Sequence, residues 1–181
     1  MFPKSYADRV ARLRVPAGFV LVAAFAWFSH PSAMSLLAGI PISLAGLAVR
    51  AWAAGHLAKN QVLATSGPYA CTRNPLYLGT LLVAGGLAVA SRSIGLALLF
   101  AAVFGLIYLP VIELEEQHLR KLFPQYAAYA REVPRIWPKW KAVRSQTGFR
   151  GELYKKNQEY QALAGFMAGT IILIWKAYKM W

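Results

Sequence analysis

The sequence predicts an all-α, polytopic membrane protein with four core transmembrane helices, a fifth helix near the C-terminus and one polar pocket on the cytoplasmic side. Three observations support this fold class. Of the 181 residues, 57% are hydrophobic and only 15% are charged, whereas soluble domains carry roughly 25% charged residues. The charges are clustered, so long uncharged runs separate them. A polar, turn-rich stretch interrupts these runs, and membranes tolerate irregular backbone only at an interface, inside protein or beside a wet cavity.

The first apolar run covers residues 15–28 and follows a basic stretch. Arg9, Arg12 and Arg14 recur at near-helical spacing, which predicts a basic interfacial helix. The run is shorter than the ~20 residues that a spanning helix needs. Either the interfacial turns complete the span, or the helix is little tilted.

The second apolar run covers residues 34–57. It contains Gly39, Pro41 and Gly46, which membrane helices tolerate. Arg50 lies late in this run and has two alternative interpretations. It either snorkels to the membrane surface, which its position near the helix end favours, or points into the polar pocket.

A polar loop over residues 59–74 separates this run from the third, at residues 76–90. Pro75 suits the first turn of a new helix, and the third run holds glycines that allow close helix approach, namely Gly79, Gly85 and Gly86. A tight turn at residues 91–93 leads into the fourth run, residues 94–112, which continues without a break to residue 123. The two runs therefore form an antiparallel hairpin, and acidic residues follow where the helix leaves the membrane.

After a break at residues 123–126, we expect a short helix with Tyr126, Tyr129 and Arg131, followed by extended chain at residues 133–138. An interfacial belt is expected at Trp137, Lys139, Trp140 and Lys141. A polar linker follows at residues 145–151. The last apolar run, residues 163–175, is either a fifth spanning helix or a helix lying on the membrane. We therefore expect a membrane core at residues 1–144 and a linker with a C-terminal helix at 145–181.

The net charge of +13 favours membrane lipids with anionic headgroups as partners, rather than nucleic acid, because the basic residues flank apolar runs. If the first four runs span, the basic residues before the first run, between the second and third runs and directly after the fourth run all lie on one side. The loops on the opposite side carry only Arg92 among Lys and Arg. The positive-inside rule then places the N-terminus and the polar loop in the cytoplasm, at the inner membrane if the protein is bacterial. No secretory signal is expected. Cys71, the single cysteine, excludes an internal disulfide and a multi-cysteine metal site, and we expect no metal.

This topology brings three polar pieces to one membrane face: residues 61–77, 113–118 and 126–135. Segments that are distant in sequence but meet at one depth can form a ligand pocket.

Five short motifs lie in and beside these pieces, and their order and spacing together are informative. They are Gly67-Pro68-Tyr69, Arg73-Asn74-Pro75-Leu76-Tyr77-Leu78-Gly79, Glu115-Glu116, Phe123-Pro124-Gln125-Tyr126-Ala127-Ala128-Tyr129 and Val133-Pro134-Arg135. Over residues 57–138 the chain resembles the isoprenylcysteine carboxyl methyltransferase and phospholipid methyltransferase superfamily. The family pattern is Arg-His-Pro-x-Tyr-x-Gly, a Glu pair one helical hairpin later, and a Tyr-x-x-Tyr segment. Asn74 stands where His is commoner, and no Arg lies just before the Glu pair.

The resemblance implies an integral-membrane methyltransferase that uses S-adenosyl-L-methionine. It implies catalytic roles for Arg73, Glu116, Tyr129 and Arg135. It implies cofactor contacts from Leu63, Gly67, Pro68, Tyr69, Arg73, Asn74, Pro75, Tyr77, Gly79, Glu115 and Glu116. Arg73 can hold the cofactor carboxylate in a bidentate pair, and the glutamates can accept from its amino or ribose groups. Tyrosine ring faces suit the adenine or the sulfonium.

Methyl transfer is a displacement at carbon that needs no covalent enzyme intermediate, so positioning and desolvation supply most of the rate. The resemblance implies an acceptor that is a lipophilic small molecule or lipidated substrate, with either a prenylcysteine-like carboxylate or a phospholipid amine. Arg131 or Arg135 can orient an anionic acceptor, and a lipid tail would enter sideways between helices.

Plainer interpretations stay open at each of these positions. Arg73 can be a positive-inside anchor, Glu113 a solvated residue and His118 a structural histidine, while Tyr126 and Tyr129 can be interface aromatics. Two other functions also stay open. One is an NADPH-dependent membrane reductase of the sterol-reductase type, although such enzymes generally carry more helices, and the other is a non-catalytic membrane scaffold.

Overall fold

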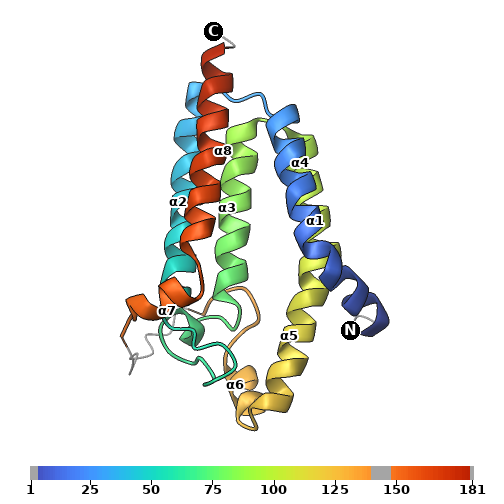
Figure 1. Cartoon of the computed structure of the whole chain (residues 1–181), viewed down its shortest axis with the longest axis vertical. Coiled ribbons are helices and arrows are strands. Elements are labelled where there is room, and N and C mark those ends of the chain that lie inside the picture. The colour runs from blue at the N-terminus through green and yellow to red at the C-terminus, as the bar shows by residue number, and fades with distance from the viewer. Residues whose placement is uncertain (1–3, 140–147, 180–181) are drawn as a thin grey trace. The chain divides into compact units, whose positions relative to one another are not determined.

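A computed structural model describes residues 4–139 and 148–179, and every regular element in these two ranges is a helix (Figure 1). This confirms the predicted all-α class. The chain divides into two compact units. Unit 1 comprises residues 1–43, 84–117 and 165–181, and unit 2 comprises residues 44–83 and 118–164.

In unit 1, α1 (Lys4–Phe28) packs beside α4 (Ile94–Val103), as Figure 1 shows. The axis of α1 bends by 50° between Leu13 and Pro16. A proline inside a helix removes one backbone hydrogen bond and clashes with the preceding turn, which accounts for the kink. The basic stretch and the first apolar run are thus one bent helix.

The fourth apolar run is a helix over Ile94–Leu122, which confirms its predicted continuation beyond the apolar residues. Between α4 and α5 (Leu109–Leu122) it contains one π-helical turn, η2 (Phe104–Tyr108), which was not predicted. Such a turn changes the carbonyl pairing of the helix locally. The hydroxyl of Tyr6 on α1 donates to the carbonyl of Leu106 in this turn, at 2.8 Å.

The core of unit 1 also draws on α2 (Ala33–Ala54), α3 (Pro75–Ser91) and α8 (Tyr160–Lys179). Its buried cluster consists of Phe25, Leu36, Ala90, Leu96, Leu173 and Ala177. Lys176 of α8 donates to the carbonyls of Ala26 and Trp27 at 2.8 and 3.1 Å. A lysine ammonium in this place satisfies carbonyls that the end of α1 leaves open.

Within the described residues, three helices are long and apolar enough to cross a membrane: Ala33–Ala54, Ile94–Leu122 and Tyr160–Lys179. The bent α1 makes a fourth if its two parts count as one span. The last apolar run therefore meets the criteria of a spanning helix. The third run forms α3, which begins at Pro75 as predicted but has only 17 residues. The expected total of four core spans plus a fifth thus stays a prediction.

Unit 2 contains the loop between α2 and α3, with the 3₁₀ helix η1 (Gly67–Ala70), and two short helices, α6 (Tyr126–Glu132) and α7 (Gly151–Lys156). Helix α6 was predicted, whereas η1 and α7 were not, because such short helices show too few turns for a clear periodicity. Of the predicted belt, Trp137 is exposed, while Trp140 and Lys141 lie outside the described residues. The predicted domain boundary at 144/145 also lies there and stays a prediction.

Candidate functional site

The candidate site is built on the loop over residues 55–74 of unit 2. Helix η1 turns the Gly-Pro-Tyr motif inward, and Gly67, Pro68 and Tyr69 are all buried. Gly67 has a φ of +58°, and a Cβ at this position would lie 2.7 Å from the ring of His56. Only glycine avoids both the backbone strain and the clash. The Nδ1 atom of His56 lies 2.9 Å from the carbonyl oxygen of Trp52, and since a carbonyl only accepts, this nitrogen carries a proton.

Backbone hydrogen bonds join the loop to the segment over residues 129–139. The amide of Arg73 donates to the carbonyl of Pro134 at 2.9 Å, and the amide of Lys139 donates to the carbonyl of Cys71 at 3.0 Å. The two segments are about 60 residues apart in sequence. This contact confirms that two of the three predicted polar pieces meet.

Side chains strengthen the same contact. Thr72 Oγ1 and Asn74 Nδ2 both donate to the carbonyl of Arg135, at 3.2 and 3.0 Å. Tyr129 Oη donates to the carbonyl of Tyr69 at 2.7 Å. Thr72 is 1% exposed, so its hydroxyl is a buried group that needs such a partner. We call the residues 129–139 that hold the loop in this way the middle clamp.

In the middle clamp, the amide of Arg73 donates to the carbonyl of Pro134, the residue before Arg135, and the side chains of both arginines are half-buried. A guanidinium group can bind a carboxylate or phosphate through charge-assisted hydrogen bonds. Asn74 and Tyr129 instead use their side chains to fix backbone. The structure thus makes them positioning residues of the loop, and their predicted direct contact with cofactor or substrate is a further role that stays a prediction.

The remaining predicted loop residues take several places. Leu63 and Tyr77 are buried, at 8% and 7% exposure, and Pro75 opens α3. A Cβ on Gly79 would lie 2.5 Å from Arg50 Cγ and 2.7 Å from the carbonyl oxygen of Gly46. This glycine therefore allows α2 and α3 to touch, and its predicted cofactor contact stays a prediction.

The predicted Glu pair lies on α5 in unit 1. Glu116 is 2% exposed and Glu113 is 8% exposed, so the prediction of a solvated Glu113 is wrong, while Glu115 is exposed. The roles of Glu115 and Glu116 stay predictions of the sequence. Among residues 4–139 and 148–179, no group of three His, Cys, Asp or Glu side chains could hold a metal ion.

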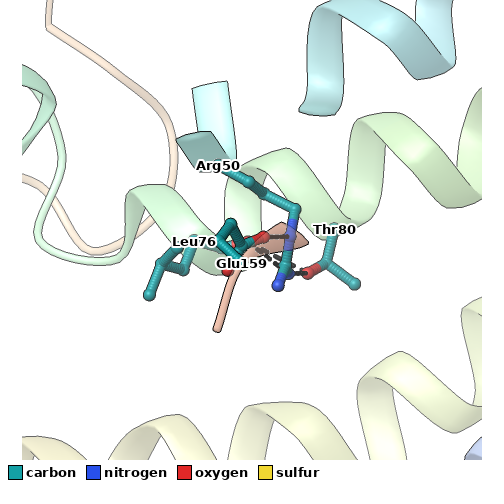
Figure 2. A network of polar contacts seen from close by, with 4 residues as sticks. All are labelled: Arg50, Leu76, Thr80 and Glu159. Atoms are coloured by element: carbon teal, nitrogen blue, oxygen red, sulfur yellow. Dashed lines mark hydrogen bonds and ion pairs between the residues drawn. The ribbon is translucent and has the colours of Figure 1, made fainter. Parts of the chain in front are cut away.

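Arg50 neither snorkels nor stands alone. Figure 2 shows its guanidinium in an ion pair with Glu159 and in hydrogen bonds to the hydroxyl of Thr80 and the carbonyl of Leu76. The arginine side chain is 23% exposed and that of Glu159 is 8% exposed. Arg50 thus connects α2, the first turns of α3 and the segment before α8, all within unit 2.

Sequence reasoning missed Glu159, although a signal was available. An arginine within an apolar run calls for a counter-ion, and the chain has only seven acidic residues. Glu159 is 109 residues away from Arg50, and it stands in a polar stretch to which no role had been given. Asn157 was also missed, because it lies in the same polar stretch and its partners are at least 100 residues away. It donates to the carbonyls of Ala54 and Leu57 at the end of α2, both at 2.9 Å.

Comparisons with known proteins agree with this architecture. The sequence profile of the phospholipid methyltransferase family matches residues 15–126. The cobalt-zinc-cadmium resistance protein CzcN of Cupriavidus metallidurans is 35% identical over 111 residues, which cover 60% of this chain and 50% of that protein. This chain thus matches about half the length of that relative.

The nickel-cobalt-cadmium resistance protein NccN of Alcaligenes xylosoxydans xylosoxydans is 28% identical over 175 residues, which cover 91% of this chain and 81% of that protein. No solved structure matches. The match to the family profile extends over more than half of the chain, and it includes the loop whose geometry is described above. The chain therefore belongs to the phospholipid methyltransferase family.

Proposed function

We propose that this protein is an integral-membrane methyltransferase that moves a methyl group from S-adenosylmethionine to a lipophilic acceptor. One observation carries the proposal: the middle clamp, through Tyr129 and the Val-Pro-Arg segment, holds the Gly-Pro-Tyr and Arg-Asn-Pro motifs in a chain of the phospholipid methyltransferase family. A scaffold without catalytic activity would not need an arginine-bearing loop that is held in one conformation.

The residues of unit 2 fit the polar end of this cofactor. Arg73 would bind its carboxylate, because the planar guanidinium group suits that charge and geometry. Tyr69 and Tyr77 would offer aromatic surface to the adenine or to the sulfonium. The bound cofactor supplies an electrophilic methyl carbon; a lone pair of the acceptor forms the new bond to it while the carbon–sulfur bond breaks and its electrons stay on sulfur.

The protein's own contribution is to orient the two reactants and to exclude water. The acceptor would be a carboxylate or an amine attached to a lipid tail, and Arg131 or Arg135 would orient an acceptor that carries negative charge. The distribution of basic residues supports a site that faces the cytoplasm. These assignments are part of the proposal.

The binding step is tested by calorimetric titration of the purified protein with S-adenosylhomocysteine and, separately, with NADPH. We expect binding of S-adenosylhomocysteine and none of NADPH. Binding of NADPH alone would favour a reductase, and binding of neither would favour a scaffold; either result overturns the proposal. Incubation of lipid extracts with a donor labelled in its methyl group then identifies the acceptor by the fraction that gains label.

The Arg73→Ala variant tests the assigned site directly. Removing a bidentate partner of a carboxylate should raise the dissociation constant for S-adenosylhomocysteine about 10- to 100-fold, in line with hydrogen bonds to charged groups. Lys59→Ala is the matched control, since Lys59 is an exposed cation of the same loop. Glu116→Gln tests the sequence-based assignment of Glu116 in the same titration. Equal affinities of Arg73→Ala and wild type would show that the arginine lies outside the site.

The names of the two relatives concern metal resistance. We propose that the methylated product of this chain serves the same physiology. A strain that lacks the protein should grow less well in cobalt or cadmium, and the wild-type gene should restore growth while the Arg73→Ala gene should not. Full restoration of growth by the Arg73→Ala gene would show that resistance does not depend on methyl transfer.

A further inference from the structure

We infer that residues 149–159, beyond the family-matched region, form a second clamp that holds both ends of the candidate cofactor loop, with Asn157 and Glu159 as its positioning residues. We call this segment the C-terminal clamp. Its hold on the loop follows from contacts within unit 2 alone. Its effect on cofactor binding rests on the proposed function.

The C-terminal clamp first holds the start of the loop. Asn157 Nδ2 donates to the carbonyl of Ala54, the last residue of α2, and to that of Leu57 in the turn that follows, at 2.9 Å each. The amide of Arg150 donates to the next carbonyl in this turn, that of Gly55, at 3.0 Å. The ring of Phe149 covers the same glycine so closely that a Cβ there would lie 2.2 Å from it. The chain leaving α2 is thus fixed by three residues of one segment.

The same segment holds the other end of the loop through Arg50. Glu159 pairs with Arg50, which also bonds Thr80 Oγ1 and, at 3.4 Å, the carbonyl of Leu76 (Figure 2). Leu76 and Thr80 lie in the first turns of α3, directly after Arg73-Asn74-Pro75. A carboxylate that is 8% exposed needs its ion partner, because removing one member of such a pair leaves a buried charge uncompensated.

The loop is therefore held at both ends by the C-terminal clamp and in its middle by the middle clamp. A loop that is ordered before its ligand arrives loses less conformational entropy on binding. Loosening the C-terminal clamp should consequently weaken cofactor binding without removing any group that touches the cofactor. It should also make the loop backbone exchange its amide hydrogens faster, whether or not a ligand is present.

Amide hydrogen exchange of the full-length protein in lipid nanodiscs tests the clamp independently of any activity. In Glu159→Ala, peptides from residues 55–74 should exchange at least several-fold faster than in wild type, while peptides of α1 and α4 in unit 1 keep their protection. Glu159→Gln should recover part of the difference, because its amide oxygen still accepts from Arg50. Glu152→Ala is the matched control, since Glu152 is an exposed carboxylate of the same segment.

Asn157→Leu provides a second variant of similar size that cannot donate, in case Glu159→Ala does not fold. Unchanged exchange of the loop in the variants that fold would overturn the inference. Loss of protection throughout unit 1 would also overturn it, since Asn157 and Glu159 would then support the fold as a whole. Titration with S-adenosylhomocysteine is the second readout, with an expected rise of about 10-fold in the dissociation constant for a loosened loop. If wild type does not bind this ligand, the proposed function fails while the exchange data still decide the clamp.

Discussion

At the scale of single residues, Asn74 explains how this chain can differ from the commoner family pattern. Its side-chain amide donates to the carbonyl of Arg135 at 3.0 Å. A histidine ring nitrogen that carries a proton can donate the same bond. The two residue types are therefore interchangeable as donors in this hydrogen bond.

Substitutions of Asn74 should separate donors from non-donors. Asn74→His should keep the thermal stability and ligand affinity of wild type, whereas Asn74→Asp should lower the free energy of unfolding by about 1–3 kcal/mol, because a carboxylate cannot donate to the carbonyl of Arg135, which then loses this bond and keeps that from Thr72. Thermal unfolding in detergent and titration with S-adenosylhomocysteine provide the two measurements. Equal behaviour of Asp and His at this position would mean that the hydrogen bond to Arg135 contributes nothing.

Tyr129 offers a second test at this scale. Its hydroxyl donates to the carbonyl of Tyr69 at 2.7 Å, so Tyr129→Phe should remove one loop contact and keep the ring. We expect ligand affinity to fall about 2- to 10-fold, the equivalent of one hydrogen bond, with the rate at saturating substrates nearly unchanged. A large fall in that rate with unaltered affinity would instead identify the hydroxyl as a group of the reaction itself.

At the scale of elements, glycines decide how closely α2 and α3 pack in unit 2. The backbone of Gly46 would be 2.7 Å from a Cβ on Gly79. Small residues at such contacts let helix backbones approach in membranes, where van der Waals packing rather than hydrophobicity drives association.

Two neighbouring glycines of α3 provide a matched pair. Gly79→Ala should destabilise the protein by about 1–3 kcal/mol, because the added methyl group has no room. Gly85→Ala should be neutral or slightly stabilising, because nothing lies within 4 Å of its Cβ position. Unfolding midpoints in the same detergent compare them. If Gly79→Ala is as stable as Gly85→Ala, the helices are not in the close contact described above.

The fold and the site were predictable from the sequence to different degrees. Apolar runs, Pro75 and the polar break after Leu122 identify the long helices, because each signal lies within the segment that it shapes. The motifs also indicate that the loop with Arg73 and the segment with Arg135 lie together. The partners of Arg50 and the end of α2 were not predictable, because Glu159 and Asn157 act over more than 100 residues and leave no local pattern. The π turn at Phe104–Tyr108 was likewise not predictable, because its residues do not differ in composition from the apolar run around them.

At the scale of the whole molecule, the single cysteine reports on which side of the membrane the loop lies. Cys71 is partly exposed, and its backbone carbonyl accepts from Lys139 of the middle clamp. The positive-inside rule predicts that an impermeant maleimide labels it in inside-out vesicles but not in intact spheroplasts. Cys71→Ser combined with His30→Cys is the control, since His30 is exposed between α1 and α2, on the side predicted to face outward. Labelling of Cys71 from outside would reverse the proposed orientation.

The C-terminal clamp has a consequence for how the protein is made. Arg50 leaves the ribosome 109 residues before Glu159, so at roughly 5–20 residues per second the arginine waits about 5–20 s for its partner. During that time the helices around the loop enter the membrane while Arg50 still lacks its counter-ion, Glu159. The loop can adopt its final conformation only after Glu159 has been synthesised, and a chain that stops before Asn157 lacks the residues that hold both ends of the loop.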